Sequence, residues 1–334
     1  MKELAAVLRD LVREGRAPGV LATLVSVAGS SYRRPGARLL LTAEGRRLGS
    51  ISGGCLEEDV LVRAQRVAVT GQGELITYDT SAENDLVWGV GLGCHGVVQI
   101  LLERLPQKPT WLEVLSANLA LRRPTPLAVV WRAADPAALG THLAADLTSA
   151  AKPSPDSTAE IFFDTIAPPP ALTIFGAGDD AMPLSRLVKE LGWHLTIADP
   201  RAAFATSDRF PLADKIIVAP ANELVGRAPL DSESLAVVMT HHYVHDRPIL
   251  AELLQRPLAY AGLLGPRKRA GQILDDLGHS ISADQRARLH APVGLDLGAE
   301  TPEEVALSIL AEMCAVLRQR DGRPLRERMR PIHD

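Results

Sequence analysis

Short apolar runs alternate with helical patterns throughout the second half of the chain, and few folds accommodate this rhythm. The apolar runs cover residues 172–175, 194–198, 215–219, 235–239 and 259–264. Strands that are separated by helices are joined by crossovers, so neighbouring strands lie parallel and helices cover both faces of the sheet. The alternation therefore predicts a Rossmann-like, doubly wound parallel-sheet domain over residues 171–334.

The first half of the chain has a mixed pattern. Leu4, Val7, Leu8 and Leu11 follow helical spacing and predict an amphipathic helix, rather than a signal peptide, at the start. Further helices are predicted at 56–69 and 111–121, and strands at 19–27, 38–42, 46–52, 74–79, 97–105, 126–131 and 159–165. We therefore expect an N-terminal mixed α/β domain over 1–166, followed by a stiff linker at the proline run 168–170.

Composition limits the partners and the compartment. The 334 residues carry a net charge of −4 and only 4% aromatic side chains, which argues against a nucleic-acid partner. No apolar run approaches the roughly 18 residues that would span a bilayer. The three cysteines (Cys55, Cys94 and Cys314) are odd in number and far apart, as is typical of reduced thiols. We expect a cytoplasmic protein without a membrane or nucleic-acid partner.

A glycine fingerprint opens the second half, in the stretch LTIFGAGDDAMPL. Gly176 and Gly178 follow an apolar run, and Asp199 ends the next run about 20 residues later, where an acidic residue would bond a ribose hydroxyl. Asp179 and Asp180 argue against conventional dinucleotide binding, because their carboxylates would compete for the free N–H groups of the helix and repel phosphate. Two interpretations stay open: a nucleotide-like ligand, or a scaffold whose helix start is capped by its own side chains.

A second candidate anion site is the stretch YAGLLGPRKR. Gly262 and Gly265 belong to a glycine-containing turn after a predicted strand, and Arg267 opens the next predicted helix. Backbone donors and cations would converge there, as a phosphate requires. The alternative is a solvated basic helix start.

The stretch THHYVHD follows another predicted strand and therefore lies at a carboxyl end of the sheet, where ligands of such folds bind. His241 is the candidate ligand contact, because it comes directly after the strand. A metal site formed with His242, His245 and Asp246 is a weaker alternative, since the spacing is not that of a closed zinc site.

Two cysteines in the first half share an unusual glycine-rich setting. Cys55 follows Gly53 and Gly54 in SGGCLEEDV, and Cys94 follows Gly93 in WGVGLGCHGVVQ. Glycines let the backbone approach a ligand closely, and a helix N-terminus favours a thiolate. The anionic end of a ligand would find cations upstream, in GSSYRRPGAR, at Arg33, Arg34 and Arg38. The alternative for both cysteines is a structural thiol in a tight turn.

The last predicted helix begins with TPEE. Thr301 is expected to cap it, with Pro302 in its first turn and Glu304 completing a capping box. Cys314 lies on the predicted apolar face of this helix, with Leu307, Leu310 and Leu317, and is expected to serve as a core residue.

Taken together, these motifs resemble the XdhC/CoxI family of accessory proteins for molybdenum hydroxylases such as xanthine dehydrogenase. The resemblance rests on GSSYRRPGARLLLTAEGRRLGSISGGCLEEDV, GLGCHGVVQILLER, FGAGDDAMPL, DPR, VVMTHHYVHD, YAGLLGPRKR and APVGLDLGAETPEEVALSILAEM. It implies a chaperone that binds the molybdenum cofactor, including its nucleotide form, holds it while its terminal sulfur is installed, and passes it to an apo-enzyme.

The resemblance also implies site residues and partners. Cys55 and Cys94 are the family-motif cysteines, and Cys55 is the expected ligand at the metal end, near a soft metal–sulfur centre. The implied partners are an apo molybdenum hydroxylase and a cysteine desulfurase, and the implied assembly is a homodimer. His95 departs from the family pattern, in which many members have glycine. The resemblance implies no catalytic residue.

Two other functions remain as alternatives. One is an NAD(P)-dependent oxidoreductase that would use Gly176, Gly178 and Asp199, and the pair Asp179 and Asp180 disfavours it. The other is a structural assembly factor that bridges cofactor supply and target enzyme without holding a ligand. The hydroxylase itself is excluded, because three cysteines cannot supply the four ligands of even one iron–sulfur cluster.

Overall fold

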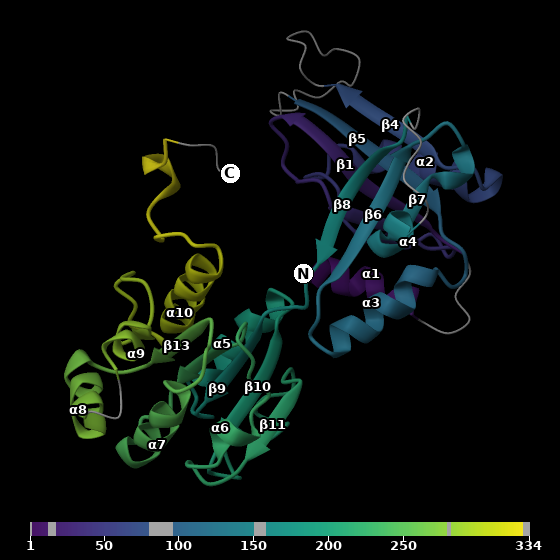
Figure 1. Cartoon of the computed structure of the whole chain (residues 1–334). Coiled ribbons are helices and arrows are strands. Elements are labelled where there is room, and N and C mark those ends of the chain that lie inside the picture. Colours follow the sequence, from purple (N-terminus) through teal and green to yellow (C-terminus); the bar gives the residue numbers. More distant parts are fainter. Residues whose placement is uncertain (1, 13–17, 80–95, 150–157, 279–281, 330–334) are drawn as a thin grey trace. The chain divides into compact units, whose positions relative to one another are not determined.

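The computed structural model of the chain describes all residues except 1, 13–17, 80–95, 150–157, 279–281 and 330–334. The chain forms two compact units, Met1–Pro168 and Pro169–Asp334, which divide inside the proline run (Figure 1). Among the described helices, none combines the length and the apolar character that crossing a membrane would require.

The N-terminal unit is built around a five-stranded antiparallel sheet whose middle strand is β1 (Val20–Gly29). The strand order is β3-β2-β1-β5-β4, with β2 (Arg38–Leu41), β3 (Arg47–Gly49), β4 (Glu74–Asp79) and β5 (Gly96–Arg104). Side chains alternate along a strand, so Val20 and Ala22 face one core and Leu21 faces another. The sheet is therefore covered on both faces.

Helix α2 (Glu57–Thr70) covers one face of this sheet and packs on β1 and β5. A second sheet, of order β7-β6-β8, packs on the other face through Val25, Leu101 and Val129. Its strands are β6 (Thr125–Arg132), β7 (Gly140–Leu143) and β8 (Glu160–Ile166), and the remaining helical elements are α1 (Lys2–Leu11), α3 (Thr110–Ala120), α4 (Ala144–Ser149) and the 3-10 turn η1 (Pro136–Ala138).

The C-terminal unit contains a six-stranded sheet in which every pairing is parallel. The order is β11-β10-β9-β12-β13-β14, with β9 (Ala171–Phe175), β10 (His194–Asp199), β11 (Lys215–Val218), β12 (Leu235–Val238), β13 (Tyr260–Leu263) and β14 (Leu289–His290). This is the doubly wound order: β9 and β12 lie in the middle of the sheet, and the strands that follow each of them in sequence are added on opposite sides. The predicted Rossmann-like sheet is confirmed.

Helices cover both faces of the parallel sheet (Figure 1). One face is packed by α5 (Ala181–Glu190) and α10 (Pro302–Leu317), and the other by α6 (Leu224–Arg227), α7 (Tyr243–Leu253) and α8 (Arg267–Leu277). The remaining elements are α9 (Ala283–Ala287) and the 3-10 turn η3 (Leu325–Glu327). The two core layers are therefore separate, as in other doubly wound sheets.

Helix α10 begins as predicted. Thr301 Oγ1 accepts from the Glu304 N–H, and the Glu304 carboxylate accepts from the Thr301 N–H, which completes the capping box. Cys314 packs against the core, and burial raises the pKa of its thiol. The prediction for Leu307 is wrong, because that side chain is exposed.

Strands β7 and β14 are the described strands that the sequence did not predict, and the short helix α4 and the turn η1 were not predicted either. Neither strand has an apolar run: β7 has the sequence GTHL, and β14 contains only Leu289 and His290. Both lie at the edge of their sheet, where one neighbouring strand suffices to fix them. Short edge strands carry little hydrophobic pattern of their own, so the pairing partner defines them.

Candidate functional site

Cys55 is exposed and lies in the loop that leads into α2. The helix begins at Glu57 with Leu56 as its N-cap residue, so Cys55 comes directly before the cap. Gly54 has a φ of +114°, a left-handed conformation that favours glycine, and the space beside it is open. The loop therefore presents a thiol to solvent at a helix start, as the sequence predicts.

Glu57 fixes the shape of this loop from inside. Its buried carboxylate accepts from the Ser52 N–H at 2.9 Å and from the hydroxyls of Ser50 and Ser52. Ser52 Oγ in turn accepts from the N–H groups of Gly54 and Leu56. Burial alone would raise the pKa of Glu57, but hydrogen bonds from Ser52 and Ser50 outweigh it and lower the pKa to about 2. The carboxylate is thus an ionised anchor for the loop.

The Cys55 loop lies at one end of the strands of the five-stranded sheet. At this end β1 and β4 end and β5 begins, because Gly29 pairs with Gly96 and Asp79 pairs with Val97. The first turn of α2 reaches the same end, since the Tyr78 hydroxyl donates to Asp59 at 2.6 Å. Gly93 and Cys94 precede Gly96 in sequence and lie outside the described residues.

Tyr32 lies beside the Cys55 loop, because a side-chain carbon at Gly53 would approach its ring to 3.5 Å. Its ring is 67% exposed and therefore available to a ligand. Sequence reasoning missed Tyr32. The signal that could have indicated a ligand contact there is an aromatic residue directly before two arginines. Arg34 is exposed, whereas Arg33 is half-buried and paired with Glu3 at 2.6 Å.

Arg38 does not belong to this site. Its side chain is only 7% exposed, and its guanidinium donates to Asp164 on β8 at 2.7 Å and to the Gly36 carbonyl at 2.9 Å. The prediction that Arg38 serves an anionic ligand is therefore corrected: the arginine binds the second sheet of its own unit. A buried guanidinium in such a pair is not available to a ligand in solvent.

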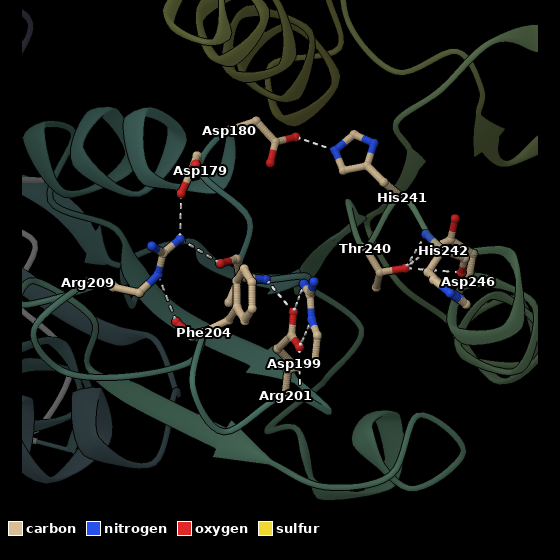
Figure 2. A network of polar contacts seen from close by, with 11 residues as sticks. Asp179, Asp180, Asp199, Arg201, Phe204, Arg209, Thr240, His241, His242 and Asp246 are labelled. Carbon is tan, nitrogen blue, oxygen red and sulfur yellow. Dashed lines mark hydrogen bonds and ion pairs between the residues drawn. The ribbon is translucent and has the colours of Figure 1, made fainter.

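A second cluster lies at the carboxyl edge of the parallel sheet, around the glycine turn after β9 (Figure 2). Gly176 has a φ of +127°, and a side-chain carbon there would approach the Met239 carbonyl to 2.5 Å. The glycine is thus required by the close approach of β12. It serves the turn of the fold. At Gly178 a side chain would meet only the Asp180 carboxylate, the end of a side chain that can rotate away, so the backbone requires glycine less strictly there.

Asp199 is completely buried and has no capacity left for a ribose hydroxyl. One oxygen accepts from the Arg201 N–H at 2.8 Å and from Arg201 Nε at 2.9 Å. The other accepts from the Ala177 N–H at 2.7 Å and from Arg201 Nη2 at 2.8 Å. A carboxylate offers about four acceptor positions, and all four are taken. The predicted ribose contact of Asp199 is corrected accordingly.

Asp179 and Asp180 do not cap α5. Asp180 is the N-cap residue, but its side chain makes no capping hydrogen bond within the described residues. Its carboxylate instead lies 2.6 Å from His241 Nε2, and the Asp179 carboxylate accepts from Arg209 at 2.8 Å (Figure 2). His241 has a φ of +58°, which is uncommon for a residue with a side chain. Of the two interpretations that the sequence left open, the helix start capped by its own side chains is therefore wrong.

The stretch after β13 differs from the predicted anion site. Gly262 lies inside β13, where a side chain would collide with Val293 and Tyr260, so its role is packing. Gly265 does form the turn, with a φ of +139°, and Arg267 begins α8 as an exposed side chain. The next basic residue toward the core, Arg269, is paired internally.

Arg269 and Thr240 both bind the buried carboxylate of Asp246. The sequence left Asp246 open as a metal ligand, a polar ligand contact or a helix cap, and the structure makes it the internal counter-ion of Arg269 on α8. Among the described residues, no group of three or more His, Cys, Asp or Glu side chains is arranged to hold a metal ion. His242 and His245 stack on each other instead, with ring centroids 4.7 Å apart.

The Asp180–His241 pair makes a prediction for titration. The hydrogen bond that the His241 ring donates to Asp180 raises the pKa of His241 above 6.5, so the stabilisation from this pair is present below pH 6.5 and is lost as the pH rises through the raised value. An NMR titration of the His241 ring should give a pKa above 6.5, and Asp180→Asn should lower it. A wild-type value at or below 6.5 would contradict the pairing.

The two units define a class of protein: a mixed α/β unit with an exposed cysteine at a helix start, followed by a Rossmann unit. Residues 12–79 match the XdhC and CoxI family, and residues 172–313 match the XdhC Rossmann domain. A protein from Bacillus subtilis that is named as a probable xanthine dehydrogenase subunit is 35% identical over 322 residues, which cover 91% of this chain and 94% of that protein. The chain therefore belongs to the XdhC and CoxI family.

Two further relatives are similar over most of their length. The molybdenum cofactor insertion chaperone PaoD of Escherichia coli is 25% identical over 300 residues, covering 89% of this chain and 83% of that protein. A crystal structure described as a xanthine dehydrogenase from Bacillus halodurans matches with a TM-score of 0.81 and 30% sequence identity, covering 97% of this chain and 99% of that chain.

Proposed function

We propose that this protein is an accessory protein for a xanthine dehydrogenase-type molybdenum hydroxylase: it binds the molybdenum cofactor, holds it during sulfuration and delivers it to the apo-enzyme. Family membership supports a role connected with the molybdenum cofactor, because one similar protein is named as a molybdenum cofactor insertion chaperone and another as a xanthine dehydrogenase subunit. The single structural observation that carries the proposal is the exposed Cys55 thiol on its anchored loop.

The Cys55 loop fits such a ligand. The cofactor combines a soft metal–sulfur centre, a flat pterin and a phosphate. A cysteine thiolate is the side chain that suits the metal–sulfur end. The open space beside Gly54 leaves room for the ligand, and the internal hydrogen bonds of Ser52 and Glu57 hold the loop in one shape before binding. A preformed loop avoids the entropy that ordering a flexible one would cost.

The remaining parts of the cofactor would meet the neighbouring loop. The exposed Tyr32 ring offers a flat apolar surface for a pterin, and Arg34 offers an unburied cation for a phosphate. Cys94 is proposed as the second thiol of the site, because it comes two positions before Gly96, which pairs with Gly29 at the same end of the strands. We further propose contacts with a cysteine desulfurase, and a homodimer, as the family resemblance implies.

An anaerobic titration of extracted molybdenum cofactor tests this assignment. The protein is separated from free cofactor by gel filtration, and bound molybdenum is measured. We expect stoichiometric binding by the wild type and at least a tenfold loss with Cys55→Ala. The matched control is Cys314→Ala, which removes a partly buried thiol of the other unit and should bind within twofold of wild type. Equal retention by wild type and Cys55→Ala would show that the metal end of the cofactor is held elsewhere.

A further inference from the structure

We propose that the dinucleotide crevice of the Rossmann unit is filled by the protein's own side chains, with Arg201 in the place of the adenosine and Asp180, held by His241, in the place of the pyrophosphate. The inference concerns the C-terminal unit alone and does not depend on cofactor binding at Cys55. The fold implies a nicotinamide or flavin dinucleotide as the ligand of this site. The side chains that line the site do not fit such a ligand.

The topology gives the position of the crevice. In a doubly wound sheet, ligands bind at the carboxyl edge between the two strands from which the chain winds in opposite directions. Here these strands are β9 and β12, which pair in parallel from Leu172 and Leu235 to Phe175 and Val238. The loop after β9 carries Asp180 and the loop after β12 carries His241, so their hydrogen bond joins the two loops at this position (Figure 2).

The adenosine side is occupied by a network around Phe204. A dinucleotide would require a free carboxylate at the end of β10, but Arg201 and the Ala177 N–H saturate Asp199. The Arg201 guanidinium also stacks on the Phe204 ring, with its carbon 4.1 Å from the ring centroid. A ribose hydroxyl could reach Asp199 only after breaking one of these charge-assisted hydrogen bonds, which are stronger than hydrogen bonds between neutral groups.

Arg209 closes this side further. It donates to the Phe204 carbonyl at 3.1 Å, to the Ala177 carbonyl at 3.1 Å and to the Asp179 carboxylate at 2.8 Å. The guanidinium thereby joins the segment after β10 to the glycine turn after β9. Its charge is directed at Asp179, so it is not a free cation waiting for a phosphate.

The pyrophosphate side is occupied by Asp180. A pyrophosphate would approach the backbone at the second glycine and the start of α5. One carboxylate oxygen of Asp180 lies 2.6 Å from the position that a side-chain carbon would have at Gly178. The other oxygen is hydrogen-bonded to His241. The carboxylate thus provides the negative charge that a phosphate group would bring.

Charge repulsion disfavours a pyrophosphate at this position in addition to the steric effect of the Asp180 side chain. Like charges in close contact repel each other, and they do so more strongly near a protein surface than in bulk water. A pyrophosphate at the start of α5 would face both Asp179 and Asp180. The nearby cations Arg209 and His241 offset part of this repulsion, but each is already bonded to one of these carboxylates. Neither cation is therefore free to neutralise an incoming phosphate, which disfavours an anionic ligand at the start of α5.

Titrations with NADH and with ADP-ribose test the proposal on the full chain. NADH binding is followed by nicotinamide fluorescence and ADP-ribose binding by calorimetry. We expect no saturation of the wild type below about 1 mM, a range typical of non-specific contact. Asp180→Ala should bind ADP-ribose at least fivefold more tightly than wild type, and Asp180→Ala combined with Arg201→Gln should bind it more tightly again.

The matched control is Asp275→Ala, which removes one exposed carboxylate from α8 and should leave the affinity unchanged. Asp180→Asn keeps the side-chain volume and separates the effect of charge from that of space. The proposal is overturned if the wild type binds either probe with a Kd below about 100 µM. It is equally overturned if Asp180→Ala gains less than fivefold, because Asp180 would then not be what occupies the site.

Discussion

Glu57→Gln is expected to lower the free energy of unfolding of the N-terminal unit by about 3 kcal/mol at neutral pH and to disturb the Cys55 loop. The magnitude follows from the pKa of Glu57, which the fold lowers from 4.5 to about 2, since each pKa unit corresponds to about 1.4 kcal/mol. Glu57 is 2% exposed, so solvent screens these hydrogen bonds very little. A glutamine keeps the shape but loses the charge that Ser50 and Ser52 stabilise.

The pH dependence has a definite sign. Because the folded-state pKa of Glu57 is depressed, its stabilisation is fully present above the unfolded-state value near 4.5 and is lost as the pH falls toward about 2. The wild type should therefore lose stability relative to Glu57→Gln as the pH is lowered through this range. The difference between the two proteins should shrink from about 3 kcal/mol toward zero.

Native-state hydrogen exchange is the suitable measurement, because amides of β1 and β5 report the unfolding of the N-terminal unit separately from the Rossmann unit. The control is Glu58→Gln, which changes an exposed neighbour in the same turn of α2 and should cost less than about 0.5 kcal/mol. If both variants lose equal stability, the anchoring role of Glu57 is wrong. A loss of molybdenum retention in Glu57→Gln alone would connect the anchor to the Cys55 site.

Sequence reasoning succeeded where the signal is local. The capping box of α10 depends on Thr301 and Glu304, three positions apart, and Cys55 precedes a helix whose apolar spacing is visible within 14 residues. The parallel sheet was predicted because each buried strand is a continuous apolar run. Such patterns involve only residues that are close in sequence, so they can be recognised without the tertiary structure.

The sequence-based assignments failed where a contact depends on the folded conformation and leaves no pattern among neighbouring residues. Arg38 was assigned to a ligand because its counter-ion, Asp164, lies 126 positions away. Asp199 looked available because saturation by Arg201 depends on the conformation after β10. Tyr32 was missed because only the fold brings its ring to Gly53. Arginine and aspartate bind ligands and each other by the same chemistry, so residue type alone does not distinguish a site from an internal pair.

Asp164→Ala is expected to destabilise the N-terminal unit by about 3–5 kcal/mol, the usual cost of leaving a buried charge without its partner. The Arg38 guanidinium is 7% exposed and, of its acceptors among the described residues, would keep only the Gly36 carbonyl. Arg38→Met should cost less, because the Asp164 carboxylate left behind is 20% exposed and can be hydrated. Exchange of β1 and β5 amides again provides the measurement.

Two controls make the Asp164→Ala test specific: a double variant of the same ion pair, and a second ion pair that also involves β8. Arg38→Met combined with Asp164→Ala removes both charges and should recover most of the loss, since a buried ion pair contributes little beyond its own desolvation. Arg132 and Glu160 pair between β6 and β8 at 2.6 Å, but their side chains are 52% and 41% exposed. Glu160→Ala should therefore cost at most about 1 kcal/mol. Equal losses from Asp164→Ala and Glu160→Ala would mean that burial does not decide the strength of these two pairs, although their lengths are almost the same.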